Sequence, residues 1–210
     1  MNTSEILQQI SAPNTRLGDL RKIAKEIKTD HQLAMELWQS KEFLARQLAI
    51  LIMDKKLLTA EAIDALDRDM QEHPEEESKQ LIDWLMANQL AKSKPTKLLM
   101  ESWMDSHSPL QRRIYWYYQG RLRWMGQTPP SNTEFLIEKI EERILEENPL
   151  VQWAMNFTAA QIGIFQEEYR QRCVRLGEET GLFKDEMVAK NCTPNYLPQY
   201  IEMQVAKLNK

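Results

Sequence analysis

Apolar side chains recur every three or four residues along most of the chain, and charged side chains fill the positions between them. The first clear stretch runs through Leu17, Leu20, Ile23 and Ile27. This is the period of an amphipathic α-helix that buries one face. No stretch alternates apolar and polar residues around hairpin turn residues, so the pattern predicts helices and no sheet.

The starts of the expected helices are marked by side chains that can cap them. Asp30, Ser40 and Thr59 each precede a periodic apolar run, and a side-chain oxygen there can accept a hydrogen bond from a free N–H of the first turn. Ser108 and Asn148 each stand directly before a proline, the residue favoured at the first helical position. We expect about a dozen helices of roughly 8 to 18 residues.

The links between these helices are short, and short links join neighbouring helices into hairpins. Hairpins that stack in series form a solenoid in which each pair contacts the next. We therefore expect residues 1–210 to form a single all-α helical-repeat domain. A helix bundle of two subdomains is the alternative, because no exact sequence repeat is visible.

The composition, with 42% apolar and 28% charged residues, is that of a soluble globular protein. The cysteines and histidines lack metal or redox spacing, and there is no glycine-rich phosphate loop. We therefore expect no metal and no cofactor. The first residues do not have the pattern of a signal peptide, and no apolar run approaches the ~20 residues that span a bilayer. We expect a cytoplasmic protein with no membrane contact.

Charge is unevenly distributed along the chain. The net charge of −4 means that any DNA-binding surface must be a local patch. Between residues 92 and 123 the only acidic residues are Glu101 and Asp105, and Trp and Tyr residues are frequent. Such a segment can bind phosphates and stack on bases, or it can form solvated helix faces above an aromatic core. Its basic residues are Lys92, Lys94, Lys97, Arg112, Arg113, Arg121 and Arg123.

Three short motifs follow one another along the chain. Residues 82–88 read IDWLMAN, residues 110–113 read LQRR and residues 151–157 read VQWAMNF. In this order they resemble the Trp-Asp-x-x-Asp, Leu-Gln-Arg and Val-Gln-Lys-Ala-x-x-Trp segments of the AlkD-like HEAT-repeat DNA glycosylases. Weaker similarity extends from about Arg16 to the C-terminus.

The resemblance implies a HEAT-like superhelix with a basic concave face that holds duplex DNA. Family members hydrolyse the N-glycosidic bond of cationic N3- or N7-alkylated purines without drawing the lesion into a base pocket. They use two tryptophans and an aspartate in the cleft, together with a DNA-facing arginine. In this chain the first tryptophan corresponds to Trp84, the aspartate to Asn88, the arginine to Arg112 and the second tryptophan to Phe157.

Asn88 is the most consequential of these differences. A cationic alkylpurine leaves without a strong general acid, and the sugar then develops oxocarbenium character. A nearby carboxylate stabilises that charge and can hold the attacking water, whereas an amide offers only a dipole. Loss of one preorganised electrostatic group commonly costs about 10²–10³ in rate. Asp83 does not lie on the same helix face, because it is ~140° around the helix from Asn88.

We therefore predict a DNA alkylation repair protein of the glycosylase type that has weak or absent excision of ordinary alkylpurines. One alternative is a non-catalytic DNA-binding module, and another is a protein-binding solenoid, which the acidic pI of about 5.6 favours. Each site residue also has a structural interpretation. Trp84 and Phe157 can be core side chains, Arg112 an ion-pair partner, and Asn88 a hydrogen-bonded buried amide.

Overall fold

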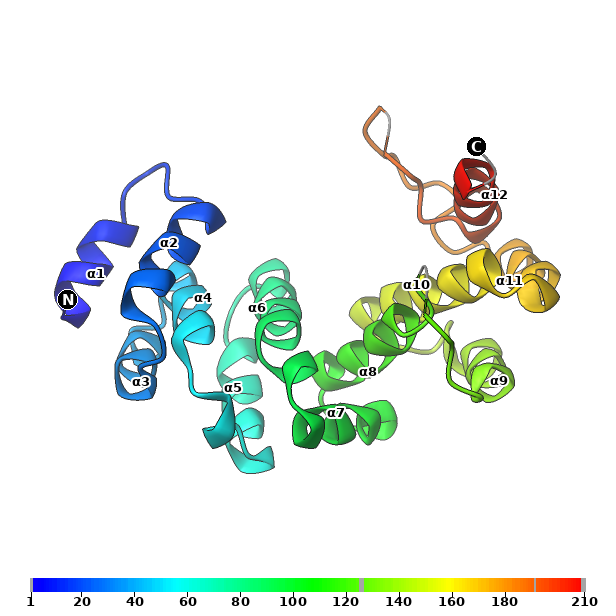
Figure 1. Cartoon of the computed structure of the whole chain (residues 1–210). Helices are drawn as coiled ribbons and strands as arrows, with labels where there is room; N and C mark the ends of the chain where they lie inside the picture. Colours follow the sequence, from blue (N-terminus) through cyan, green and yellow to red (C-terminus); the bar gives the residue numbers. More distant parts are fainter. Residues whose placement is uncertain (1, 125–126, 191, 209–210) are drawn as a thin grey trace. The chain divides into compact units, whose positions relative to one another are not determined.

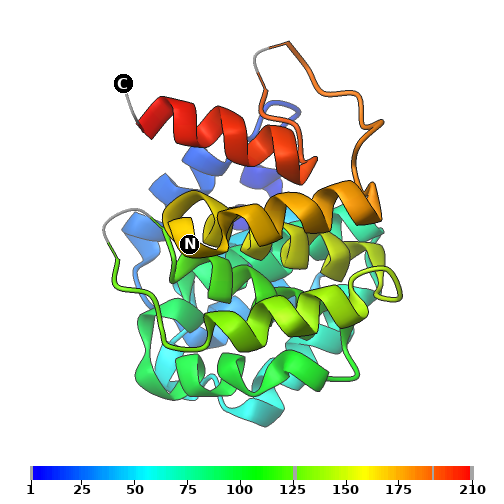
Figure 2. The same ribbon diagram turned by 90° about the vertical axis from the view of Figure 1, so that its right-hand side faces the viewer.

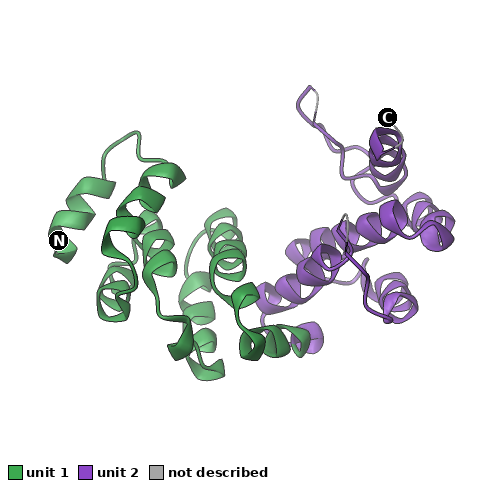
Figure 3. Ribbon diagram, in the orientation of Figure 1, with its two compact units in different colours: residues 1–102 green, residues 103–210 purple. Residues whose placement is uncertain are grey.

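The computed structural model describes residues 2–124, 127–190 and 192–208 (Figures 1 and 2). Within these ranges there are twelve α-helices, three short 3₁₀ helices and no strand, so the predicted all-α fold is confirmed. The chain divides into two compact units, residues 1–102 and residues 103–210 (Figure 3). None of the described helices is long and apolar enough to cross a membrane.

Unit 1 is built around α4, which packs against α2, α3 and α6. Most of its side chains are buried, and they include the polar Arg46 and Gln47. The α-helices of unit 1 are α1 (Thr3–Ile10), α2 (Leu17–Ile27), α3 (His31–Gln39), α4 (Phe43–Ile52), α5 (Ala60–Gln71), α6 (Glu75–Asn88) and α7 (Lys94–Glu101). The 3₁₀ helices η1 (Lys55–Leu57) and η2 (Leu90–Lys92) lie in two of the links.

A buried guanidinium joins three helices of unit 1. Arg46 is 2% exposed, and its charge lies 4.8 Å from the centre of the Trp38 ring. It donates to the backbone oxygens of Trp38 at 3.2 Å and of Asp69 at 2.6 Å. The Trp38 indole N–H donates to the Asp69 carboxylate at 2.7 Å. Because a buried polar group must find partners, these bonds fix α3, α4 and α5 against one another.

Four of the five predicted N-caps are confirmed, and the Ser40 cap is wrong. Ser40 ends α3, where its hydroxyl donates to the Leu37 carbonyl at 2.7 Å. The next residue, Lys41, has a φ of 63°, which turns the chain out of the helical conformation. The following helix begins only at Phe43. The confirmed caps are Asp30, Thr59, Ser108 and Asn148.

Unit 2 is built around α10, which packs against α8, α9, α11 and α12. Figure 2 shows α12, at the C-terminal end, lying beside α11. The helices of unit 2 are η3 (Trp103–Asp105), α8 (Pro109–Arg121), α9 (Thr133–Arg143), α10 (Pro149–Phe165), α11 (Glu167–Thr180) and α12 (Leu197–Leu208).

The helices α8 and α10 approach closely and run in the same direction. Arg113 contacts Trp153, and one turn further along both helices Tyr117 contacts Phe157. A Cβ atom at Gly120 would lie 2.8 Å from two ring carbons of Phe157, so a side chain there would displace the ring or the helix backbone. Thr158 donates to the Trp116 carbonyl at 2.5 Å across the same contact.

Candidate nucleic-acid interface

Trp84 lies on the last turns of α6, where its indole is held on two sides. The ring N–H donates to the Gln47 carbonyl of α4 at 3.1 Å, and the Arg21 guanidinium of α2 lies 4.9 Å from the ring centre. The side chain is half-buried. Trp84 is therefore positioned by α4 and carries a cation on its π face, an arrangement that stabilises the ring electrostatically.

Asn88 lies one turn after Trp84 on the same face of α6. Its amide donates to the Trp84 carbonyl at 2.9 Å, which confirms that the two residues are neighbours. The next residue, Gln89, is buried and donates to the Ile50 carbonyl at 2.6 Å and the Met53 carbonyl at 3.2 Å. These bonds fix the end of α6 on α4. The group held beside Trp84 is thus an amide that carries no charge.

Arg112 and Phe157 lie in unit 2, and Arg112 is held by an ion pair. Its guanidinium donates to the Glu147 carboxylate from Nε at 3.2 Å and from Nη2 at 3.0 Å. It also donates from Nη1 to the Ser106 carbonyl at 2.7 Å. The side chains of Arg112 and Glu147 are only 19% and 15% exposed. Arg112 therefore joins the start of α8 to the link before α10, as the structural interpretation of this residue proposed.

Phe157 belongs to a row of two arginines and four aromatic rings on unit 2. Trp153 and Phe157 stack at 5.6 Å with their planes 10° apart, and Tyr117 meets Phe157 edge-on at 5.0 Å. Residues four apart lie on the same face of a helix, so α8 and α10 each contribute members to the row, and Trp124 follows the end of α8. We call this set the arginine–aromatic row: Arg113, Trp153, Tyr117, Phe157, Arg121 and Trp124.

The two ends of the row differ in exposure. Arg113 is 2% exposed, stacks on Trp153 at 4.5 Å and donates to the Leu150 carbonyl at 3.0 Å. Arg121 is half-buried and lies 5.8 Å from the Tyr117 ring centre and 5.5 Å from that of Trp124. Trp124 is 49% exposed. The accessible cation and the accessible ring are therefore at the Arg121 end.

The remaining basic residues of the predicted DNA-binding segment fall into two groups. The side chains of Lys92, Lys94 and Lys97 are exposed on η2 and α7 of unit 1. Arg123 is 1% exposed and donates to the Gln119 carbonyl at 2.9 Å and to Asn132 Oδ1 at 2.6 Å. Burial lowers the pKa of its guanidinium to about 10. Arg113 and Arg123 are thus buried inside unit 2, and we do not include them in the DNA-binding surface proposed below.

Sequence reasoning missed the residues that position Trp84. Gln47 is 37 positions away in the chain and contributes a backbone carbonyl, which any residue type could supply. Arg21 is one of several charged residues between the apolar positions of α2. Neither carries a sequence signal. Within the described ranges, no group of three or more His, Cys, Asp or Glu side chains is placed to hold a metal ion.

Helices that follow one another along the chain and pack against their neighbours, with no strand in the described residues, define an all-α protein of the helical-repeat class. The sequence profile of the family described as "DNA alkylation repair enzyme" matches residues 8–176. Because this match covers most of the chain, the protein belongs to that family, as the motifs at residues 82–88, 110–113 and 151–157 predicted.

A solved structure has the same fold. It is described as "A new family of proteins related to the HEAT-like repeat DNA glycosylases with affinity for branched DNA structures". The two chains superpose with a TM-score of 0.71 at 20% sequence identity, over 98% of this chain and 88% of the other. This likeness confirms the HEAT-like repeat architecture. A comparison with curated proteins finds no match.

Proposed function

We propose that the protein binds DNA and that its excision of cationic alkylpurines is weak or lost. The observation that carries the second part is the hydrogen bond between the Asn88 amide and the Trp84 carbonyl. The resemblance to AlkD-like glycosylases implies a carboxylate at this position. A neutral amide that is tied to its own helix cannot supply the negative charge that stabilises an oxocarbenium-like sugar.

The first part of the proposal rests on family membership and on the groups that are accessible to a phosphate backbone. Arg121 can reach a phosphate, and Trp124 offers a ring on which a base can stack. The exposed Lys92, Lys94 and Lys97 add positive charge on unit 1. Because the protein as a whole has a net charge of −4, we expect binding that depends on these few cations and weakens steeply with salt.

The DNA ligand that we propose includes branched structures as well as duplex. The structure that shares this fold belongs to proteins whose description names an affinity for branched DNA. A protein that recognises DNA shape needs phosphate contacts and stacking surfaces and does not need a hydrolytic carboxylate. The absence of a carboxylate at Asn88 is therefore compatible with a DNA-binding role.

Fluorescence anisotropy with a three-way junction, a flap and a matched duplex tests this proposal. We expect the native protein to bind at low salt and Arg121→Ala to weaken binding by roughly tenfold, with the salt slope reduced by about 1. Arg175→Ala is the matched control, because Arg175 is exposed on α11 outside the row. The same complexes, made with N7-methylguanine or N3-methyladenine in the DNA, should release little or no base above the spontaneous rate.

A protein-binding solenoid is the competing function, and one observation favours it. The helices α11 and α12 border a groove of ≈ 520 Å³ that includes Val174, Ile201 and Val205. Apolar surface of this kind can take a partner protein. If the native protein binds none of the three DNA structures at low salt, the DNA-binding proposal fails and this function replaces it.

A further inference from the structure

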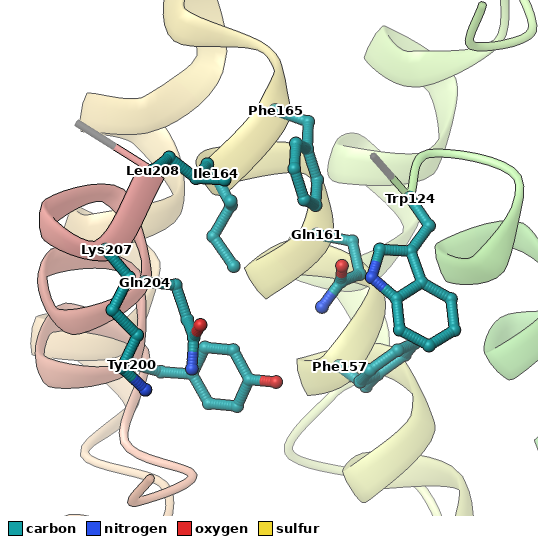
Figure 4. A pocket seen from close by; sticks show the side chains of 9 residues that line it. All are labelled: Trp124, Phe157, Gln161, Ile164, Phe165, Tyr200, Gln204, Lys207 and Leu208. Carbon is teal, nitrogen blue, oxygen red and sulfur yellow. The ribbon is translucent and has the colours of Figure 1, made fainter. Parts of the chain in front are cut away.

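A pocket lies where the arginine–aromatic row ends. It has a volume of ≈ 330 Å³ and is formed by side chains of α10 and α12 together with Trp124 (Figure 4). Trp124 lies on one side, Tyr200, Gln204 and Lys207 of α12 lie on the other, and Gln161 lies between them. Phe157, Ile164, Phe165 and Leu208 complete the lining.

The pocket combines aromatic walls with fixed amide groups. Trp124, Phe157 and Tyr200 supply rings, and aromatic rings are the surfaces on which proteins stack unpaired bases. Gln161 is only 4% exposed and lies between Trp124 and Tyr200 (Figure 4), while Gln204 donates to the Thr193 hydroxyl at 3.0 Å. A glutamine amide both donates and accepts, which is what the hydrogen-bonding edge of a base requires.

The size of the pocket and the cations beside it limit the kind of ligand that it can bind. A volume of ≈ 330 Å³ is at the lower end of the range for small-molecule sites, so it can hold one heterocycle but no helix or duplex. Lys207 is exposed at the edge of the pocket, and Arg121 lies 5.5 Å from the Trp124 ring centre. Two cations beside a stacking surface match a base that is still attached to its phosphates.

We propose that this pocket binds one unpaired nucleobase, at a DNA branch point or a single-stranded end. The base stacks on Trp124, its polar edge faces Gln161 and Gln204, and Lys207 and Arg121 contact the neighbouring phosphates. The inference rests on the proposed DNA-binding function and adds the nucleotide that distinguishes a branch from a duplex. It concerns a base that is already unpaired, so no energy is spent on extruding a paired lesion.

The pocket is tested by a thermodynamic cycle in which the unpaired base of the DNA and the Trp124 ring of the protein are removed separately and together. The probes are two flap DNAs that differ at one unpaired nucleotide, which carries a base in one and is abasic in the other. The protein variants are Trp124→Ala and, as a matched control, Phe135→Ala. Phe135 is 42% exposed in unit 2 and is not part of the pocket lining. Affinities are measured by anisotropy, and circular dichroism checks that each variant is folded.

We expect Trp124→Ala to weaken binding to the base-containing flap by roughly 5- to 150-fold, the range measured for loss of one base–aromatic stack. The native protein should lose a similar factor on the abasic flap, where Trp124→Ala should then change little. Phe135→Ala should leave both affinities unchanged. Equal effects of Trp124→Ala on both flaps, or no effect on either, would overturn the pocket while leaving DNA binding intact. Absence of native binding to both flaps would overturn the DNA-binding proposal itself.

Discussion

Replacing Glu147 with alanine removes the carboxylate that holds Arg112, and the loss of these contacts lowers the free energy of unfolding. The variant loses charge-assisted hydrogen bonds to Nε and Nη2 of Arg112, and such bonds contribute about 1.5–3 kcal/mol. Because the two side chains keep 19% and 15% exposure, water compensates part of the loss. We expect Glu147→Ala to lower the free energy of unfolding by about 2 kcal/mol.

Arg112→Ala should cost about 3 kcal/mol, because it also removes the bond to the Ser106 carbonyl. In the double variant the shared interaction is lost only once, so we expect the free energy of unfolding to fall by about 3.5 kcal/mol. This is less than the sum of the two single losses, and the difference is a coupling energy of about 1.5 kcal/mol. Urea denaturation of the native protein, both single variants and the double variant measures these values. A coupling below about 0.5 kcal/mol would show that Arg112 is free of Glu147 in solution and would refute its structural role.

Two further predictions concern the interior of unit 2. Gly120→Ala should destabilise the protein by about 1 kcal/mol, because the contact of its Cβ with Phe157 at 2.8 Å costs more than the ~1 kcal/mol gained in helix propensity; a rise in the urea midpoint would contradict this close approach. Burial raises the pKa of the Cys173 thiol to about 12. The folded state therefore favours the neutral thiol, and this contribution to stability is complete below about pH 9 and lost as the pH rises towards 12. At pH 8 an alkylating reagent should modify the exposed Cys192 and spare Cys173, and equal rates at the two thiols would refute the burial.

The helices were predictable because their signals are local. The spacing of Leu17, Leu20 and Ile23 and the caps at Asp30 and Thr59 act within one or two turns, and the structure confirms them. The proximity of Trp84 and Asn88 was predictable for the same reason, since four residues separate neighbours on a helix face. The failure at Ser40 shows the limit, because a serine can begin one helix or end the one before it.

The environment of the basic residues was not predictable, because it depends on contacts between helices. Arg121 and Arg123 are two positions apart, and yet one is accessible beside Trp124 whereas the other is 1% exposed among Gln119, Asn132 and Thr133. In the sequence, both arginines belong to the same basic segment, residues 92–123. The arginine–aromatic row had a signal that could have been found, since α8 and α10 both carry row members four residues apart.

The pocket at the end of the row had no sequence signal. Tyr200 lies 39 residues after Gln161, beyond α11 and a long connecting segment, and only the packing of α12 on α10 brings the two side chains together. Periodicity predicts that α12 is a helix, but it does not predict the neighbour against which α12 packs.

The claim that the amide of Asn88 limits excision is tested most directly by measuring base release by the native protein and by Asn88→Asp. The substrates are the N7-methylguanine and N3-methyladenine duplexes, and anisotropy confirms that both proteins bind them. An ionised aspartate cannot donate to the Trp84 carbonyl, so its carboxylate is free to turn towards a bound sugar. We expect little or no release above the spontaneous rate by the native protein and clearly faster release by the variant. Release by the native protein at a rate that the variant does not exceed would contradict the claim that Asn88 limits the chemistry.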